Sequence, residues 1–195
     1  MSNFQETKTY QNLVNAFAGE SQARNRYTFF ASVAKKAGFE QIAAIFLETA
    51  ANEKEHAKLY YNHIAENLGE LPGMMTVTGT YPIQISDTAT NLLSAAEGEE
   101  GEVVDYNEWS KVAQEEGFTD IARTFRNIAT IEDHHGKRYR ALRDNVLNDK
   151  VFEKDESTEW VCRECGYIHT GTKAPEICPT CKHPKAYFQL LCDNF

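Results

Sequence analysis

The sequence has no long apolar run and no recognisable secretion signal. None of its apolar stretches approaches the ~20 residues that span a bilayer, so a membrane protein is excluded. The first residues, MSNFQETKTYQN, have neither a basic start nor an apolar segment. We therefore expect a cytoplasmic protein, and the 42% hydrophobic content is enough to fill the core of at least one domain in 195 residues.

Positive charge is also in short supply. The chain has 20 Lys and Arg against 29 Asp and Glu, which gives a formal net charge of −9. Because nucleic-acid binders contact phosphates through clustered Lys and Arg, a general nucleic-acid binder is excluded. Acids and bases balance from Glu159 to Phe195, so the whole negative excess lies in residues 1–158.

Cysteine is absent from most of the chain. All five cysteines lie in the tail that begins at Cys162. An odd, tail-clustered set does not suit the disulfide framework of a secreted protein, so a C-terminal metal module is the better interpretation.

The first 147 residues contain an internal repeat at an offset of 79 residues. It keeps unlike residue types in step over about 48 residues without a gap, which is typical of a duplicated structural unit. The matching pairs include Gly19/Gly98, Glu20/Glu99, Tyr27/Tyr106, Gly38/Gly117, Phe46/Phe125, Glu53/Glu132, His56/His135 and Tyr60/Tyr139.

Each repeat is predicted to form two helices separated by a glycine, Gly38 or Gly117. Glycine and proline (Gly69, Pro72, Gly73, Gly79 and Pro82) mark Leu68–Ser86 as a connection rather than a helix. Two helix pairs joined by one long crossover predict a mainly α protein with a four-helix bundle. The predicted helices are Lys8–Ala37, Glu40–Asn67, Thr88–Glu116 and Thr119–Leu147.

The composition changes after the fourth helix. Residues 148–158 (NDKVFEKDEST) are charged and break the helical period, and they are followed by Cys, Gly, Pro and aromatic residues. We therefore predict a bundle domain at 1–147, a linker at 148–158 and a small metal-knuckle domain at 159–195.

Carboxylates interrupt the apolar stripes of the predicted helices. Glu53 and His56 occupy inward positions in the second helix, and Glu132 and His135 occupy the same positions in the fourth. The first helix places Glu20 in its stripe, and the third places Glu99 and Glu102 there.

Five glutamates at one level of a bundle interior require cations, and no Lys or Arg lies in the stripes at that level. One Glu from each of two helices plus Glu-x-x-His from the other two is the ligand arrangement of ferritin-like di-metal bundles. Oxygen-rich ligation with imidazole suits iron or manganese better than zinc. A single Glu-x-x-His is usually a solvated ion pair, but two copies in register inside apolar stripes favour a two-metal site.

The tail contains two Cys-x-x-Cys pairs. Cys162 and Cys165 form the first, Cys178 and Cys181 the second, and Cys192 lies outside both. Four thiolates form a tetrahedral site for either zinc or iron. Trp160, Tyr167, Tyr187 and Phe188 are the candidate core of a module this small, which needs a metal to fold.

These motifs together resemble rubrerythrin over essentially the whole chain. The segments that carry the resemblance are Ala16–Phe30 (AFAGESQARNRYTFF), the two Glu-x-x-His motifs, the crossover and the tail CRECGY…APEICPTCKHP. The resemblance implies a ferritin-like bundle with a non-haem di-iron centre and a C-terminal rubredoxin-like domain with one iron bound by four cysteines.

The resemblance also implies the roles of individual residues. The di-iron ligands would be Glu20, Glu53, Glu99, Glu102, Glu132 and His135, with Glu53 and Glu132 bridging. Glu102 would exchange with His56 as the redox state changes, and Tyr27 and Tyr106 would lie near the site. The implied ligands of the single iron are Cys162, Cys165, Cys178 and Cys181.

The activity implied by the resemblance is reduction of hydrogen peroxide to water in oxidative-stress defence in anaerobic cells. Electrons would come from an external rubredoxin or an NADH-linked flavoprotein reductase, and the protein would be a homodimer. Two alternatives stay open at this point. One is a ferroxidase that handles iron, and the other is a non-catalytic metal-binding protein with a zinc-ribbon tail.

Overall fold

The computed structural model of the chain describes residues 3–69 and 73–193. A short 3-10 helix, Phe4–Glu6, precedes four long helices, each of which ends within one residue of its predicted boundary. Three residues named in the predictions lie outside the described residues. They are Pro72 of the predicted crossover, and Met1 and Phe195 at the outer limits of the predicted domains. The helices are α1 (Lys8–Lys36), α2 (Glu40–Leu68), α3 (Thr88–Glu115) and α4 (Thr119–Leu147).

Side chains and glycines fix the helix ends. The side chain of Thr7 accepts a hydrogen bond from the backbone of Tyr10 at the start of α1, and Asp87 does the same at the start of α3. Gly38 and Gly117 follow α1 and α3 with φ of 84° and 89°, a conformation that L side chains rarely adopt. Each glycine therefore turns the chain back into the next helix of a hairpin.

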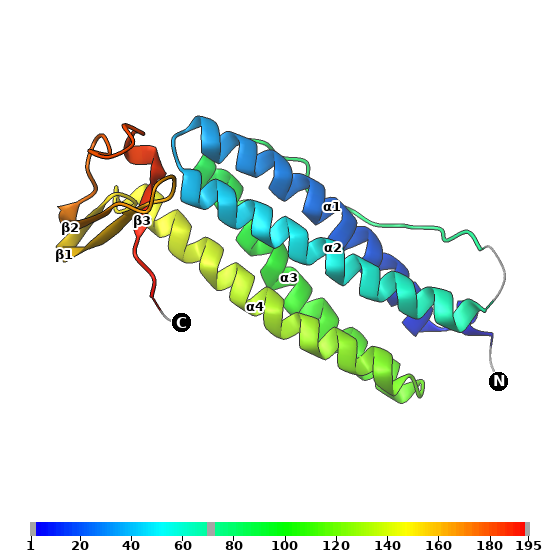
Figure 1. The fold of residues 1–195 in the computed structure, drawn as a ribbon. Coiled ribbons are helices and arrows are strands. Elements are labelled where there is room, and N and C mark those ends of the chain that lie inside the picture. The colour runs from blue at the N-terminus through cyan, green and yellow to red at the C-terminus, as the bar shows by residue number, and fades with distance from the viewer. Residues whose placement is uncertain (1–2, 70–72, 194–195) are drawn as a thin grey trace.

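The helices form a four-helix bundle made of two hairpins, α1 with α2 and α3 with α4 (Figure 1). A segment without regular secondary structure, residues 73–86, runs lengthwise along the bundle and connects them. This arrangement confirms the predicted fold class and long crossover.

The bundle core has two apolar clusters with a polar level between them. Along α2, Ile42 and Phe46 belong to one cluster, and Tyr60 and Ile64 belong to the other. The first Glu-x-x-His motif, residues 53–56, falls between these positions. Well-packed aromatic residues at both ends therefore enclose the polar level and hold its side chains in place.

The C-terminal module is a small three-stranded antiparallel sheet in the order β2-β1-β3. Its strands are β1 (Glu153–Cys162), β2 (Ile168–Lys173) and β3 (Phe188–Leu190). Trp160 and Phe188 are buried at its centre, with Tyr167 and Tyr187 packed against them, as predicted.

β1 begins inside the stretch that the sequence assigns to a linker. Glu153–Thr158 is strand, so only residues 148–152 separate α4 from the sheet. Lys173 on β2 pairs with Glu153 and closes the far end of the hairpin, which explains why a charged stretch is ordered here. The domain limits themselves stay a prediction.

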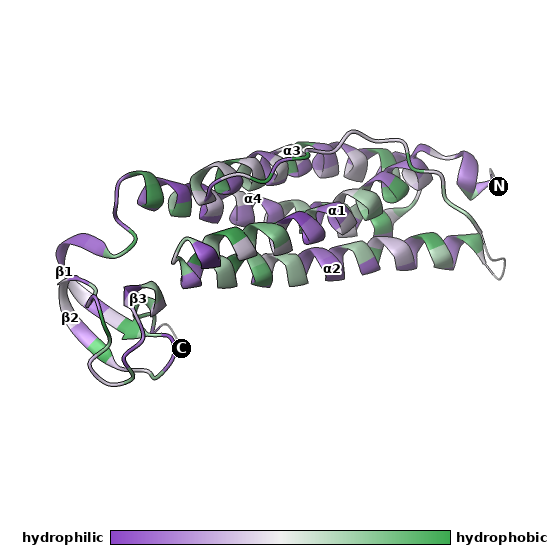
Figure 2. Cartoon of the chain, turned by 90° about the horizontal axis from the view of Figure 1, so that it is seen from above, coloured by the Kyte–Doolittle hydropathy of each residue, from purple (hydrophilic) through white to green (hydrophobic). Residues whose placement is uncertain are grey.

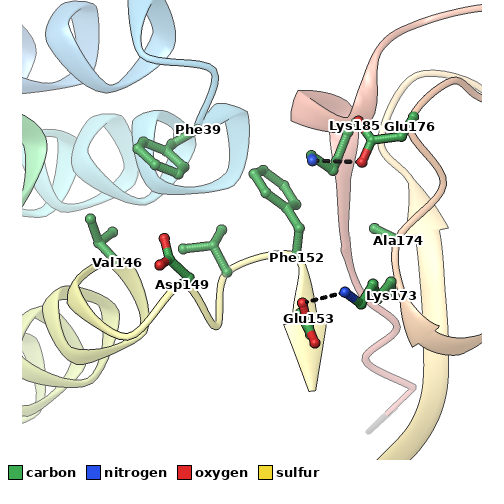
Figure 3. Close-up of a pocket in the computed structure, with 10 residues that line it drawn as sticks. Phe39, Val146, Asp149, Phe152, Glu153, Lys173, Ala174, Glu176 and Lys185 are labelled. Atoms are coloured by element: carbon green, nitrogen blue, oxygen red, sulfur yellow. Dashed lines mark hydrogen bonds and ion pairs between the residues drawn. The ribbon is translucent and has the colours of Figure 1, made fainter. Parts of the chain in front are cut away.

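The module contacts the end of the bundle where α2 begins. The rings of Phe39 and Phe152 stack with centroids 6.0 Å apart and planes 12° apart, and the Lys185 ammonium lies 5.9 Å from the Phe152 ring centre. Figure 3 shows the two phenylalanines facing each other across a cavity of about 260 Å³ at this junction.

Figure 2 shows polar and apolar residues interleaved along every helix of the bundle. In the described ranges, no helix joins the length and the apolar character that crossing a membrane would need.

Candidate metal centres

Six buried side chains from all four helices converge at the polar level of the bundle. The spacing of three residues places the Glu and His of each motif on the same face of α2 or α4. Glu20 on α1 and Glu99 on α3 approach from the opposite side. The exposed fractions are 0% for Glu20, Glu53, Glu99 and Glu132, 5% for His56 and 3% for His135.

These side chains form two overlapping sets of four. In each set, one ligand atom from every residue lies within 4.8 Å of the others. Glu53 and Glu132 belong to both sets, so their two carboxylates are placed to bridge two ions. One set is Glu20, Glu53, His56 and Glu132, and the other is Glu53, Glu99, Glu132 and His135.

Each hairpin supplies three members of one set and borrows the fourth. Glu20, Glu53 and His56 come from the α1–α2 hairpin, which takes Glu132 from the other hairpin. The second set has the reverse arrangement, with Glu53 as the borrowed ligand. The repeat in the sequence is therefore also a repeat in the site.

The imidazole nitrogens point at the carboxylates. His56 Nδ1 lies 2.9 Å from Glu53 Oε2 and 2.9 Å from Glu132 Oε1. His135 Nδ1 lies 2.8 Å from Glu132 Oε2 and 3.4 Å from Glu53 Oε1. Both nitrogens are thus directed at the oxygens with which they would share a metal ion.

The electrostatics of this level favour bound cations. Burial raises the pKa of Glu20 and of Glu99 well above the ordinary value. Burial alone would raise the pKa of Glu53, but hydrogen bonds with His135 and His56 outweigh it and lower that pKa to about 2. Burial alone would lower the pKa of His56, but hydrogen bonds with Glu132, Glu20 and Glu53 raise it to about 12.

The donor set fits two iron ions. One oxygen of each of the four glutamates is buried and receives no well-aligned hydrogen bond from any part of the chain that the structure describes. Four carboxylates balance the charge of two divalent ions, and mixed oxygen and imidazole ligands suit iron. This bundle therefore contains a carboxylate-histidine di-iron site.

Two buried tyrosines hold the carboxylates of Glu20 and Glu99, which each belong to only one set. Tyr27 on α1 donates a hydrogen bond of 2.7 Å to Glu99 Oε1 on α3, and Tyr106 on α3 donates one of 2.7 Å to Glu20 Oε1 on α1. Both tyrosines are 1% exposed. The two bonds are equivalent under the 79-residue repeat, and each fixes which oxygen is free to face a metal.

Glu102 lies next to the two sets but belongs to neither. It lines a cavity between α1 and α3 together with Tyr106, and its Oε1 lies 3.7 Å from the point where a Cβ on Gly19 would be. Burial and the nearby carboxylates of Glu132 and Glu53 raise its pKa well above the ordinary value. In this structure, His56 and not Glu102 completes the set that contains Glu20.

The four paired cysteines form a second site in the C-terminal module. The Cys162 and Cys181 sulfurs are 3.7 Å apart, as are those of Cys165 and Cys178. A tetrahedron with metal–sulfur bonds of about 2.3 Å has edges of roughly 3.8 Å. The sulfurs thus already have the spacing of a four-thiolate metal site.

Two equivalent backbone turns present these sulfurs. Gly166 N donates to Cys162 O and Lys182 N donates to Cys178 O, at 2.9 and 3.0 Å. Gly166 and Lys182 occupy the same place in their turns, with φ of 75° and 66°. This pair of knuckles confirms the metal module predicted from the cysteine spacing.

Other acidic and histidine side chains of the helices lie outside the polar level. Glu55, Glu100 and Asp133 form exposed ion pairs with Lys58, Arg140 and Lys137. His63 hydrogen bonds to Thr124 at 2.8 Å.

A cation lies beside the apolar stripe of α1, near the polar level of the bundle. Arg26 is 8% exposed, and its Nη2 lies 3.5 Å from the point where a Cβ on Gly98 would be. It follows Ala23 by three residues at the edge of the α1 stripe. A position at the edge of an apolar stripe that faces a glycine on the neighbouring helix is the sequence signal that indicates a buried Arg26.

Comparisons with known proteins match both parts of the chain. The family described as rubrerythrin matches residues 11–143, and the rubredoxin-like domain of rubrerythrin matches residues 160–189. Rubrerythrin-1 of Clostridium acetobutylicum is 49% identical, with 100% of both chains covered. Rubrerythrin of Nitratidesulfovibrio vulgaris is 44% identical, also with 100% of both covered.

Solved structures agree with these matches. A mixed-valence state of nigerythrin aligns with a TM-score of 0.63 and 35% identity, covering 98% of this chain and 94% of that one. A bacterioferritin of Desulfovibrio desulfuricans aligns with a TM-score of 0.64 and 24% identity over 73% of this chain and 82% of that one. The second match supports the ferritin-like fold of the bundle alone.

Proposed function

The chain belongs to the rubrerythrin family, and from this premise we propose that it is a non-haem di-iron peroxidase of the cytoplasm. It reduces hydrogen peroxide to water, and its electrons pass through the four-cysteine iron site. The O–O bond is broken, and two electrons and two protons are consumed for each pair of water molecules formed. The observation that carries this proposal is the presence of both metal-ligand arrangements in one chain.

The proposed ligands follow the two sets in the bundle. Glu53 and Glu132 would hold both irons, Glu20 and Glu99 would each hold one, and His135 would complete one set. His56 or Glu102 would complete the other set, a proposal supported by the position of Glu102 beside the set that contains His56. When bound, the iron pair supplies two electrons at once to a peroxide.

The remaining side chains hold carboxylates and move protons. Tyr27 and Tyr106 keep Glu99 and Glu20 in fixed orientations through their 2.7 Å hydrogen bonds. Glu102 is half-buried beside the ligand carboxylates and lines the cavity next to them, so we propose it as the group that would deliver a proton to a departing oxygen.

The cysteine module supplies electrons one at a time. Four thiolates hold a single iron in rubredoxin-like domains, and Cys165 is exposed, which allows an external donor to approach. We propose a rubredoxin or an NADH-linked flavoprotein reductase as that donor.

The position of the module supports a homodimer. The module contacts its own bundle at Phe39, and Glu53 lies 14 residues further along α2, or about 20 Å at 1.5 Å per residue. Figure 1 shows the sheet beyond the end of the helices rather than beside their middle. A second copy, placed head to tail, would bring a cysteine module closer to each di-iron site.

The decisive experiment compares two oxidants. The purified protein is reduced without oxygen and mixed in parallel with hydrogen peroxide and with O₂, and the oxidation of the di-iron site is followed by absorption. Faster oxidation by peroxide is expected. Faster oxidation by O₂ with mineral formation would indicate a ferroxidase instead, and a colourless protein with zinc in the cysteine site would remove the electron relay.

A further inference from the structure

A cavity of about 360 Å³ lies between α1, α3 and the crossover segment. Residues 78–82 of the crossover form its outer wall, and Figures 1 and 2 show this segment running along the bundle. The volume exceeds the ~30 Å³ share of one water molecule many times. The cavity can therefore hold a small polar molecule together with solvent.

The inner wall of the cavity adjoins the metal-ligand sets. Glu102 and Tyr106 both line it, and Tyr106 donates its hydrogen bond directly to Glu20. A molecule in this cavity is thus separated from a proposed iron ligand by a single side chain.

Three glycines lie where α1 and α3 line this cavity. Gly101 is exposed at the edge of the cavity, and a Cβ on it would meet no atom within 4 Å, so a larger side chain has room to enter there. Gly19 and Gly98 are equivalent in the repeat, but different side chains cover them. The Glu102 carboxylate lies over Gly19 and the Arg26 guanidinium lies over Gly98.

Arg26, in the wall of the cavity, also indicates that a ligand binds there. It is more than nine-tenths buried, it lines the cavity, and its Nε donates to Gln22 at 2.7 Å. Its Nη1 is buried and finds no acceptor among residues 3–69 and 73–193. A buried N–H group without an acceptor is costly, and a small rotation of the guanidinium toward the cavity would let a ligand oxygen accept from it.

The residues that line this cavity depart from the 79-residue repeat. Positions equivalent to Glu102 and Arg26 are occupied by Ala23 and Asp105. Neither Glu102 nor Arg26 therefore has a counterpart of the same kind in the other half of the repeat, and both line the same cavity, together with Glu97 and Asp105.

We propose that this cavity is the port through which hydrogen peroxide reaches the di-iron site. Glu102 lies at the inner end of the port, and Arg26 is a hydrogen-bond donor in its wall. Gly101 is the residue that limits the size of the substrate. The proposal rests on the proposed function. It deepens that function by naming the entry route and predicting a preference for hydrogen peroxide over bulky alkyl hydroperoxides.

The test fills the port and measures entry in two ways. Gly101→Leu places a side chain in the open space, and Gly101→Ala fills less of it. The first measurement is the second-order rate constant for hydrogen peroxide and for tert-butyl hydroperoxide. The second is the rate at which nitric oxide, a small neutral probe, binds the reduced iron site without any turnover. Val104→Leu is the control, since Val104 lies on the same helix, is 65% exposed and is not part of the cavity wall.

We expect Gly101→Leu to slow nitric oxide binding and peroxide reduction by roughly tenfold or more, with a larger loss for tert-butyl hydroperoxide and an intermediate effect of Gly101→Ala. Val104→Leu should match the wild type in both measurements, and iron content should be the same in all variants. Unchanged nitric oxide binding in Gly101→Leu would overturn the proposal.

Two further outcomes are also decisive. If Gly101→Leu fails to fold or to bind iron, Thr80→Trp fills the port from the exposed crossover, and its nitric oxide binding rate decides in the same way. If the wild type proves to react faster with O₂ than with peroxide, the proposed function fails. Slower nitric oxide binding in Gly101→Leu would then still establish the port.

Discussion

Replacing Glu99 and its tyrosine partner should make the metal-free protein more stable while destroying one metal position. Glu99 is 0% exposed, its Oε1 accepts the hydrogen bond from Tyr27, and its Oε2 receives none from the described residues. The perturbation is the double variant Glu99→Met with Tyr27→Phe. It exchanges a buried polar pair for apolar groups of similar volume.

The expected magnitude follows from burial. Replacing buried charged groups by well-packed apolar ones commonly stabilises a protein by ~1–4 kcal/mol. Glu99→Met alone would leave the Tyr27 hydroxyl buried without a partner, at a cost of ~1–3 kcal/mol, so the single variant should gain little. The double variant should gain about 2 kcal/mol, which raises the Tm by roughly 4–8 °C in a chain of this size.

The pH dependence of this gain has a definite sign. Burial, followed by repulsion from Glu53 and Glu132, raises the pKa of Glu99 in the folded protein well above 4.5. Below pH 4.5 the carboxyl is protonated in both the folded and the unfolded chain, so its ionisation does not change the stability of the wild type. As the pH rises, the unfolded chain ionises first and the wild type loses stability relative to the variant.

The assay is thermal unfolding of chelator-treated protein between pH 4 and pH 8, with Glu97→Met as the matched control. Glu97 is exposed on the same helix, so its replacement should change stability by less than about 0.5 kcal/mol. Iron should raise the Tm of the wild type far more than that of the double variant. A double variant that is less stable than the metal-free wild type at pH 7 would refute the reasoning.

Three further predictions concern other parts of the chain. Cys162→Ser should retain bundle iron but lose NADH-linked turnover with an external donor, as measured by NADH oxidation; undiminished turnover would disprove the relay. Glu116→Gln should destabilise the protein by about 1–2 kcal/mol in urea unfolding, because Glu116 accepts hydrogen bonds from the backbone of Lys8 and from the backbone and hydroxyl of Thr9; Glu115→Gln is its control. Phe152→Ala should loosen the module from the bundle, seen as faster proteolysis of residues 148–152 with the four-cysteine absorption retained; equal proteolysis would contradict this role.

The sequence predicts the bundle well because the information is local and repeated. Helix limits follow from Gly38 and Gly117, and the ligands stand out as polar residues within apolar stripes. The same holds for the cysteine knuckles, whose spacing alone defines the turns.

Features that depend on two distant segments are not predictable in this way. Arg26 lies against Gly98 on α3, and its three-residue spacing from Ala23 becomes informative only once α1 is known to pack beside α3. Glu153–Thr158 becomes a strand because a partner strand begins at Ile168. The position of Glu102 outside the ligand sets depends equally on the gap above Gly19.

Each set of four ligands takes one ligand from the opposite hairpin, so metal binding depends on both hairpins being in place. A hairpin with three ligands cannot complete a four-ligand set by itself, so each ion would link the two hairpins in addition to the apolar clusters that they share. Removal of the ions should therefore weaken the association of the hairpins, while the shared apolar clusters still hold them together. The repeat is consistent with an ancestor in which two identical hairpins bound two ions between them. Duplication would then have joined the hairpins in one chain, and Glu102 and Arg26 are positions at which the two halves now differ.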